Sequence, residues 1–385
     1  MYSLLLSIIY ISFISLGLPD SLLGAGWPVM QGELDVPLSF AGIVSMTIAC
    51  GTILSSLAAE KVGRKFGTGL VTAISVCMTA VALLGFSCST RFWMLILWAI
   101  PYGLGAGAVD AALNNYVALH YASRHMSWLH CFWGVGASVS PYIMSYSLSH
   151  TTWESGYRTV AILQMILTAC LFLSLPLWKK GEAVQDQLPP TRSLSQVLKI
   201  RGVPGVLITF FAYCALESTA GLWAATYLVE SRGVDVETAA AFASMFYLGI
   251  TAGRAVSGFI SDQLGDRNMI RLGLAVMAGG VIMIFVPVKA VALAGLLITG
   301  FGCAPIYPSI IHATPHNFGK ENSLALVGIQ MASAYTGSTL MPPLFGLIAQ
   351  HISPALFPVY LYLFVVIMIT MSERLNKLVV QNKNL

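Results

Sequence analysis

Twelve apolar runs, each about as long as a bilayer is thick, dominate this chain of 385 residues. A helix needs about 20 mainly apolar residues to cross a membrane. Only 9% of the residues are charged, against roughly 25% in soluble proteins. The sequence therefore predicts an all-α membrane protein with twelve transmembrane helices. The runs cover approximately 3–30, 38–59, 67–88, 92–119, 128–149, 157–178, 203–230, 236–261, 268–287, 290–313, 322–350 and 353–372.

The basic residues between the runs predict the orientation. If the N-terminus is inside, fifteen Lys and Arg residues lie on the inner side and four on the outer side. Short loops rich in Lys and Arg stay in the cytoplasm. We therefore expect an integral protein of the inner (cytoplasmic) membrane with both termini in the cytoplasm. The first run lacks a basic start and a cleavage site, so it is interpreted as a helix rather than a signal peptide.

A polar, basic stretch at 179–201 divides the runs into two groups of six. We expect an N-terminal bundle at 1–178, a cytoplasmic linker at 179–201, a C-terminal bundle at 202–372 and a cytoplasmic tail at 373–385. The linker is predicted to contain a short amphipathic helix over 193–200.

The fourth run carries a carboxylate and two amides, Asp110, Asn114 and Asn115, after a glycine-rich turn at 103–107. Asp110 and Asn114 are four residues apart, so they share one helix face. An intramembrane acid costs at least a few kcal/mol and usually marks a solute or proton pathway. The alternative is a buried polar contact between helices. The glycines predict close approach of a neighbouring helix.

Two further acids lie inside the apolar runs. Asp20 is expected on one helix face with Gly24 and Trp27, where a carboxylate and an aromatic ring could bind a sugar. Glu217 is its counterpart in the seventh run, followed by Trp223. The alternatives are a helix contact for Asp20 and a salt bridge to Arg254 for Glu217.

His130 opens the fifth run and should lie near the level of Asn114. It could relay protons, because histidine titrates near neutral pH. A structural hydrogen bond to Asn114 or Asn115 is the alternative. No histidine or cysteine spacing predicts a metal site, and no phosphate-binding loop, nucleophile motif or basic patch predicts a cofactor, an enzyme or a nucleic-acid partner.

The two groups of runs repeat one loop pattern. After the second run it is Ser56, Glu60, Gly63 and Arg64, and after the eighth run it is Gly258, Asp262, Gly265 and Arg267. We align Glu60 with Asp262, which is an offset of 202 residues. The glycine pairs of the fourth run (Gly103 and Gly105) and the tenth run (Gly300 and Gly302) align at an offset of 197 residues. Repeated halves around a polar site are typical of secondary transporters.

The loop pattern, its copy and the six-plus-six layout resemble the major facilitator superfamily over nearly the whole chain. Ser56 replaces the usual glycine, and Gln263 stands where a base is common. The resemblance implies that the acid and base residues hold the cytoplasmic ends closed in one state. The residues assigned to this cytoplasmic gate are Glu60, Arg64, Arg254, Asp262 and Arg267.

The segment 103–114 resembles the fourth helix of the fucose–proton symporter branch, with Asp110 in place of the usual Glu. Asp20 matches that branch's acid in the first helix. The resemblance implies proton-coupled symport of a monosaccharide by alternating access, with a site between the halves and with Asp20 and Asp110 handling the proton and the sugar. We expect Asn114 and Asn115 to bind the solute as well, and His130 to take part in proton coupling. We expect a monomer that acts on a sugar-like solute and protons. An efflux antiporter for hydrophobic compounds and a non-transporting sensor with a transporter fold are the alternatives.

Overall fold

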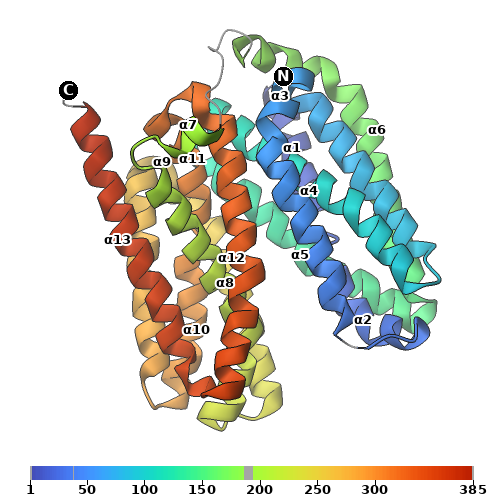
Figure 1. Ribbon diagram of the computed structural model, residues 1–385, viewed down its shortest axis with the longest axis vertical. Helices are drawn as coiled ribbons and strands as arrows, with labels where there is room; N and C mark the ends of the chain where they lie inside the picture. Colours follow the sequence, from blue (N-terminus) through green and yellow to red (C-terminus); the bar gives the residue numbers. More distant parts are fainter. Residues whose placement is uncertain (1, 38, 186–193, 384–385) are drawn as a thin grey trace. The chain divides into compact units, whose positions relative to one another are not determined.

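A computed structural model describes residues 2–37, 39–185 and 194–383, and every regular element within these ranges is a helix (Figure 1). Eight helical stretches of the described residues are long and apolar enough to cross a membrane. The elements are α1 (Tyr2–Gly17), α2 (Leu22–Glu33), α3 (Phe40–Ser87), α4 (Phe92–His120), α5 (Ser123–His150), α6 (Trp153–Gln185), α7 (Leu194–Leu198), α8 (Val203–Arg232), α9 (Val236–Phe285), α10 (Lys289–Cys303), α11 (Ile306–Phe318), η1 (Lys320–Asn322), α12 (Ser323–His351), η2 (Pro354–Leu356) and α13 (Phe357–Lys383).

The helices follow the twelve apolar runs but join or divide six of them differently. α3 contains the second and third runs, and α9 contains the eighth and ninth. With 48 and 50 residues, each is long enough for two crossings of about 20 residues. The first run is divided into α1 and α2, and the tenth into α10 and α11. α5 and α12, the two expected crossings outside the eight apolar stretches, are richer in Ser, Gly and Thr.

One glycine bends each of the two long helices. Gly67 in α3 has φ 77° and ψ 157°, and Gly265 in α9 has φ 73° and ψ 157°. This backbone conformation is essentially restricted to glycine, because a Cβ atom would clash with the chain. Each pair of crossings is therefore joined through a single residue with non-helical dihedral angles.

The chain forms two compact units. Unit 1 comprises Met1–Tyr116 and Leu129–Pro190, and unit 2 comprises Val117–Trp128 and Thr191–Leu385. The end of α4 and the start of α5 thus belong to unit 2, which differs from a division at the linker alone. In the linker, α6 continues to Gln185 and α7 covers Leu194–Leu198. The rest of the linker, 186–193, lies outside the described residues, and the expected tail begins within α13.

Glycines on α4 bring it close to α3, as the sequence predicted. A Cβ atom at Gly103 would meet the carbonyl oxygen of Ile48, and one at Gly107 would meet that of Thr52. The hydroxyl of Thr52 also donates to the carbonyl of Gly103, at 3.2 Å. This contact between two backbones fixes the rotation of α4, and with it the direction in which Asp110 points.

Unit 2 repeats this packing. A Cβ atom at Gly300 of α10 would meet the carbonyl oxygen of Phe246 of α9. The equivalent glycines of α3 and α9 are 198 residues apart. This holds for Gly51 and Gly249, which each contact the glycine turn of the following crossing, and for the bend glycines Gly67 and Gly265. The offset of 202 expected for the loop pattern is therefore wrong by about one helical turn. A slip of four residues keeps the same helix face, so the sequence pattern alone does not exclude it.

Candidate functional site

Asp20 lies in a break between α1 and α2, and not within a continuous helix. Pro19 has no amide hydrogen to donate, and the chain tightens around it. The amide of Asp20 donates to the carbonyl of Gly17 at 3.2 Å, and the amide of Leu22 to that of Pro19 at 3.1 Å. The helix face that was expected to hold Asp20, Gly24 and Trp27 is therefore wrong, because it assumed an unbroken helix.

Two aromatic donors hold the carboxylate of Asp20. The indole Nε1 of Trp133 donates to Oδ2 at 2.9 Å, and the hydroxyl of Tyr102 to Oδ1 at 3.5 Å. The Asp20 side chain is nevertheless exposed. Each carboxylate oxygen accepts more than one hydrogen bond. Asp20 is thus oriented by the protein and keeps acceptor capacity for a solute.

Small residues on α1 and α5 place Trp133 within reach of Asp20. A Cβ atom at Gly17 would meet the carbonyl oxygen of Trp133, and one at Gly136 would meet that of Ile14. The two backbones therefore touch one turn away from the break at Asp20. This close approach brings the indole of α5 against the carboxylate.

The two tryptophans chosen from the sequence make other contacts. Trp27 is only 3% exposed and packs in the apolar core of unit 1, with its ring 6.4 Å from that of Phe92. Trp223 is half-buried, and its Nε1 donates to the carbonyl of Pro342 in α12 at 2.8 Å. Among the described residues, Trp133 is the tryptophan that bonds to Asp20.

Asp110, Asn114 and His130 form a buried hydrogen-bonded chain. Asn114 Nδ2 donates to Asp110 Oδ1 at 2.8 Å, and Asn114 Oδ1 lies 3.0 Å from His130 Nε2. The exposed fractions of these residues are 4%, 0% and 5%. Because the Asn114 oxygen can only accept, this amide orientation assigns the hydrogen to His130 Nε2. The alternative named for His130, a hydrogen bond to Asn114 or Asn115, is thus observed with Asn114. The adjacent Asn115 is also buried, at 1% exposed.

Glu217 on α8 faces Arg254 on α9 inside unit 2. The distance from Arg254 Nη2 to Glu217 Oε1 is 3.9 Å, and both side chains are largely buried. The ion pair was one of the alternatives for Glu217, whereas Arg254 itself was assigned to the gate near Asp262. Side chains on a helix tilt toward its N-terminus, so the guanidinium lies further from Asp262 than its own Cα atom does.

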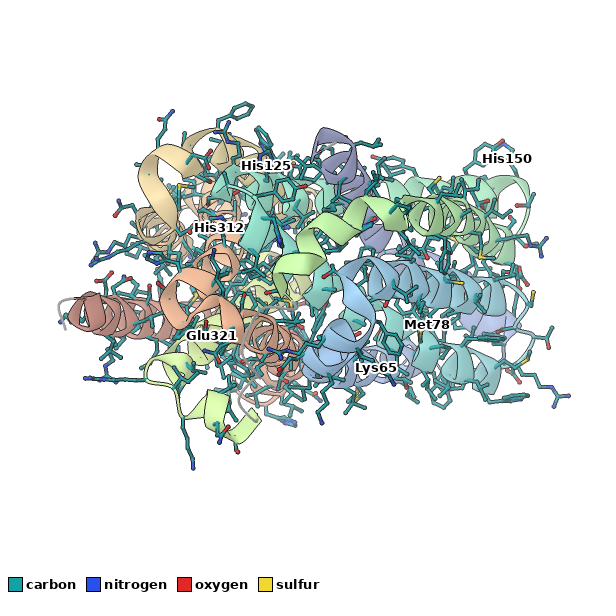
Figure 2. The ribbon with its side chains drawn as sticks, turned by 90° about the horizontal axis from the view of Figure 1, so that it is seen from above. Lys65, Met78, His125, His150, His312 and Glu321 are labelled. Atoms are coloured by element: carbon teal, nitrogen blue, oxygen red, sulfur yellow. The ribbon has the colours of Figure 1, made fainter. Side chains whose placement is uncertain are left out.

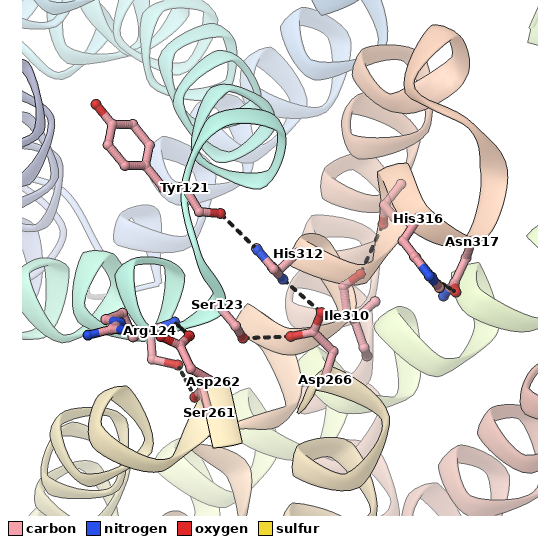
Figure 3. A network of polar contacts seen from close by, with 12 residues as sticks. Tyr121, Ser123, Arg124, Ser261, Asp262, Asp266, Ile310, His312, His316 and Asn317 are labelled. Atoms are coloured by element: carbon pink, nitrogen blue, oxygen red, sulfur yellow. Dashed lines mark hydrogen bonds and ion pairs between the residues drawn. The ribbon is translucent and has the colours of Figure 1, made fainter. Parts of the chain in front are cut away.

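Asp262 and Asp266 of α9 both contact the connection between α4 and α5 (Figure 3). The backbone amide of Arg124 donates to Asp262 at 3.0 Å, and its guanidinium forms an ion pair with the same carboxylate. Ser123 donates to Asp266 at 2.6 Å. These contacts belong to unit 2, since residues 117–128 are part of it.

The other gate residues belong to both units. Glu60 and Arg64 of α3 pair with each other within unit 1, at 3.6 Å. Arg267 is exposed and lines a cavity next to α11.

Comparison with known proteins assigns the chain to a family. The family model of the Major Facilitator Superfamily matches residues 9–287 and 205–373, which together take in most of the sequence. The chain belongs to the major facilitator superfamily. Superfamily members are transporters and not enzymes, so the chain is an integral membrane transporter with the major facilitator fold.

Similar members of the superfamily come from several organisms. Bypass of stop codon protein 6 of Saccharomyces cerevisiae is 22% identical over 92% of this chain and 79% of that protein. The fucose:proton symporter FucP of E. coli, in its outward conformation, has a TM-score of 0.74 at 14% identity, over 96% of this chain and 97% of FucP. The human organic anion transporter MFSD10 has a TM-score of 0.74 at 13% identity, over 95% and 98%. At these identities the structural likeness shows the fold alone.

The sequence alone did not indicate several residues that form the polar contacts described above. Trp133 and Tyr102 reach Asp20 from helices far along the chain, so no local spacing indicates them. Ser123 and Arg124 carried a signal, because a hydroxyl and a base follow directly after the fourth apolar run. Two acids in the copied loop pattern, Asp262 and Asp266, could have been matched to them.

Proposed function

We propose that this transporter moves a small polar solute such as a monosaccharide together with protons, by alternating access. The observation that carries the proposal is the exposed Asp20 carboxylate, fixed by Trp133 and Tyr102 inside an otherwise apolar segment. A carboxylate of this kind is costly in a membrane protein unless it meets water or a polar solute. The structural likeness to the fucose:proton symporter agrees with this solute class.

In this proposal, Asp20 and Trp133 bind the solute. The free lone pairs of Asp20 accept hydrogen bonds from hydroxyl groups, while the indole offers an apolar face beside them. Sugars present both features, since they alternate C–H and O–H groups. Glu217 and Trp223 of unit 2, expected at the solute site from the sequence, are assigned to the same solute by analogy between the repeats.

The buried chain from Asp110 to His130 carries the proton in this proposal. Asp110 is buried, so a proton bound there would leave only when water reaches it. Asn114 bonds to both neighbours and can serve either protonation state of Asp110. His130 is the second titratable group of the chain, at the far side of the Asn114 amide.

The test uses purified protein in proteoliposomes with an imposed pH gradient. A panel of monosaccharides and lipophilic cations is offered, and sugar uptake should be driven by the gradient. Asp110→Asn should keep sugar counterflow, which needs no net proton movement, but should lose uphill uptake. Asp20→Asn should lose both. Asp235→Asn is a matched control, because Asp235 caps α9, has no role in the proposal, and Asn is an equally good cap.

Uptake of lipophilic cations in place of sugars would support the efflux alternative. If Asp110→Asn still concentrates the sugar against its gradient, Asp110 does not couple transport to protons. In that case its contacts with Asn114 are structural.

A further inference from the structure

His312 of α11 lies at the centre of a second polar network, distinct from the residues assigned to transport (Figure 3). Its Nδ1 is 2.7 Å from Asp266 Oδ2, and its Nε2 is 3.0 Å from the backbone carbonyl oxygen of Tyr121. The other oxygen of Asp266 accepts a hydrogen bond from Ser123 at 2.6 Å. The imidazole therefore joins α9 and α11 to the connection between α4 and α5.

Both partners of His312 are acceptors. A backbone carbonyl carries no proton to donate, and an ionised carboxylate carries none either. A neutral imidazole has one N–H group and can serve only one of them, whereas the imidazolium has two. If His312 were neutral, one of its two nitrogens would carry no hydrogen. The lone pair of that nitrogen would then face a lone pair of the neighbouring oxygen, which is repulsive. The observed geometry is complete only when His312 is protonated.

His312 lies on the wall of a cavity, partly exposed to water and close to several charged groups. His312 and Asp266 line a cavity of about 570 Å³, and their side chains are 19% and 17% exposed. Asp262 adds a second negative charge near the ring, offset by its partner Arg124. The cavity-lining residues contributed by α8 and α13 among the described residues are uncharged, namely Val206, Thr209, Ser372, Leu375 and Asn376. The other basic residues on the cavity wall are Arg267, His316 and Lys320.

We propose that His312 is a pH-sensitive clamp, which in its protonated form holds residues 121–123 against α9 and α11 and releases them when it loses the proton. The clamp is separate from the Arg124–Asp262 ion pair. The clamp depends only on contacts within unit 2. Its test is therefore independent of the identity of the solute and of the residues proposed to couple transport to protons.

The direction of the pH effect follows from proton linkage. The docked segment requires the protonated ring, so docking is complete at low pH and is lost as the pH rises. A contact linked to one proton weakens by at most about tenfold for each pH unit above the titration point. Histidine ordinarily titrates near pH 6.5. The carboxylate of Asp266 favours the charged ring, so docking should weaken at pH values above this point.

The experiment measures amide hydrogen exchange of the full-length protein in lipid nanodiscs, in peptides that cover residues 117–128. Rates are divided by the intrinsic exchange rate at each pH, from about one unit below to two units above the ordinary histidine pKa of about 6.5. The Arg124 amide reports on docking of the segment to α9, because it donates to Asp262. Protection should fall with rising pH, by up to about tenfold per unit. In His312→Gln it should be low and independent of pH.

Two other histidines provide matched controls (His125 and His312 are labelled in Figure 2). His125 lies in the segment itself, and burial together with the charge of Arg124 lowers its pKa. It is therefore neutral across most of this range, and His125→Gln should keep the pH profile. His316→Gln, one turn beyond His312 and exposed, should keep it as well.

Wild-type protection that does not change with pH would overturn the clamp, as would a His312→Gln variant with the wild-type profile. Asp266→Asn guards against a general folding defect. It keeps an acceptor oxygen but removes the charge that faces the ring, so the pH dependence should shrink while α8 peptides stay protected. An unchanged profile in Asp266→Asn would also count against the proposal.

Discussion

At the scale of single residues, the indole of Trp133 sets the orientation of Asp20. Its hydrogen bond to the carboxylate is 2.9 Å long. Trp133→Phe removes the donor and keeps an aromatic ring. Hydrogen bonds to charged groups contribute about 1.5–3 kcal/mol, and exposure of Asp20 places this one at the lower end. We expect the affinity for the transported sugar to fall about tenfold, which corresponds to about 1.4 kcal/mol.

Titration calorimetry with the sugar that gives the strongest uptake measures this affinity. Trp27→Phe is the control, because Trp27 packs in the apolar core and should not affect binding. An equal loss in both variants would indicate a general packing effect and would remove Trp133 from the solute site.

Residue spacing predicted some of these contacts and could not predict others. Asp110 and Asn114 are one helical turn apart, so the helix alone brings them together. His130 follows a short connection, and its level relative to Asn114 could be counted along two helices. Trp133 meets Asp20 only because α1 breaks at Pro19 and packs against Gly136. That contact depends on tertiary packing, which no local pattern contains.

At the scale of helices, the bend at Gly265 tests how strongly α9 depends on one backbone conformation. A Cβ atom there would meet no atom within 4 Å, so the cost of Gly265→Ala comes from its positive φ. Residues forced into this region cost about 1–3 kcal/mol. We expect the thermal unfolding midpoint in detergent to fall.

Gly279→Ala in the same helix is the matched control. It also has free space around the new Cβ atom, but its backbone is helical. Alanine is the better helix former by up to about 1 kcal/mol, so this variant should be as stable as the wild type or more stable. Equal midpoints for the two variants would show that α9 relaxes without strain at the bend.

Helix boundaries show the limit of hydropathy as a guide. The apolar runs located every crossing, because burial in lipid demands an apolar surface over a fixed length. They did not show the breaks at residues 18–21 and 304–305, because a proline in each interrupts the helix without ending the apolar run. They also did not show that a single non-helical residue separates the two crossings of α3 and of α9, because a glycine in a longer loop and a glycine at a bend look alike in sequence.

At the scale of the whole molecule, the distribution of Lys and Arg predicts both termini in the cytoplasm. A cysteine introduced as Gln185→Cys should react with a membrane-impermeant maleimide only after cells are permeabilised. One introduced as Asp35→Cys should react in intact cells. The wild-type chain, which has seven cysteines of its own, gives the background. Labelling of Gln185→Cys in intact cells would show that the orientation is the opposite of the predicted one.

The two halves repeat at backbone level more closely than at side-chain level. The bend glycines and the glycine contacts between neighbouring crossings recur at nearly constant spacing. The polar residues do not recur in the same way: Asp20 meets aromatic donors, whereas Glu217 meets Arg254. Sequence comparison of the halves could therefore predict the fold, but not the partners of each acid.

The bends at Gly67 and Gly265 also decide where this chain could be cut or extended. Proteases and inserted domains need several residues that can leave the structure together. At each bend a single residue separates two crossings, and its neighbours are held by helical hydrogen bonds. Each of these two pairs of crossings therefore has no loop between its helices that could be cut or extended. Split-protein designs and fused reporters will have to use the chain ends or the region around the linker, because an insertion at either bend would force two membrane helices apart.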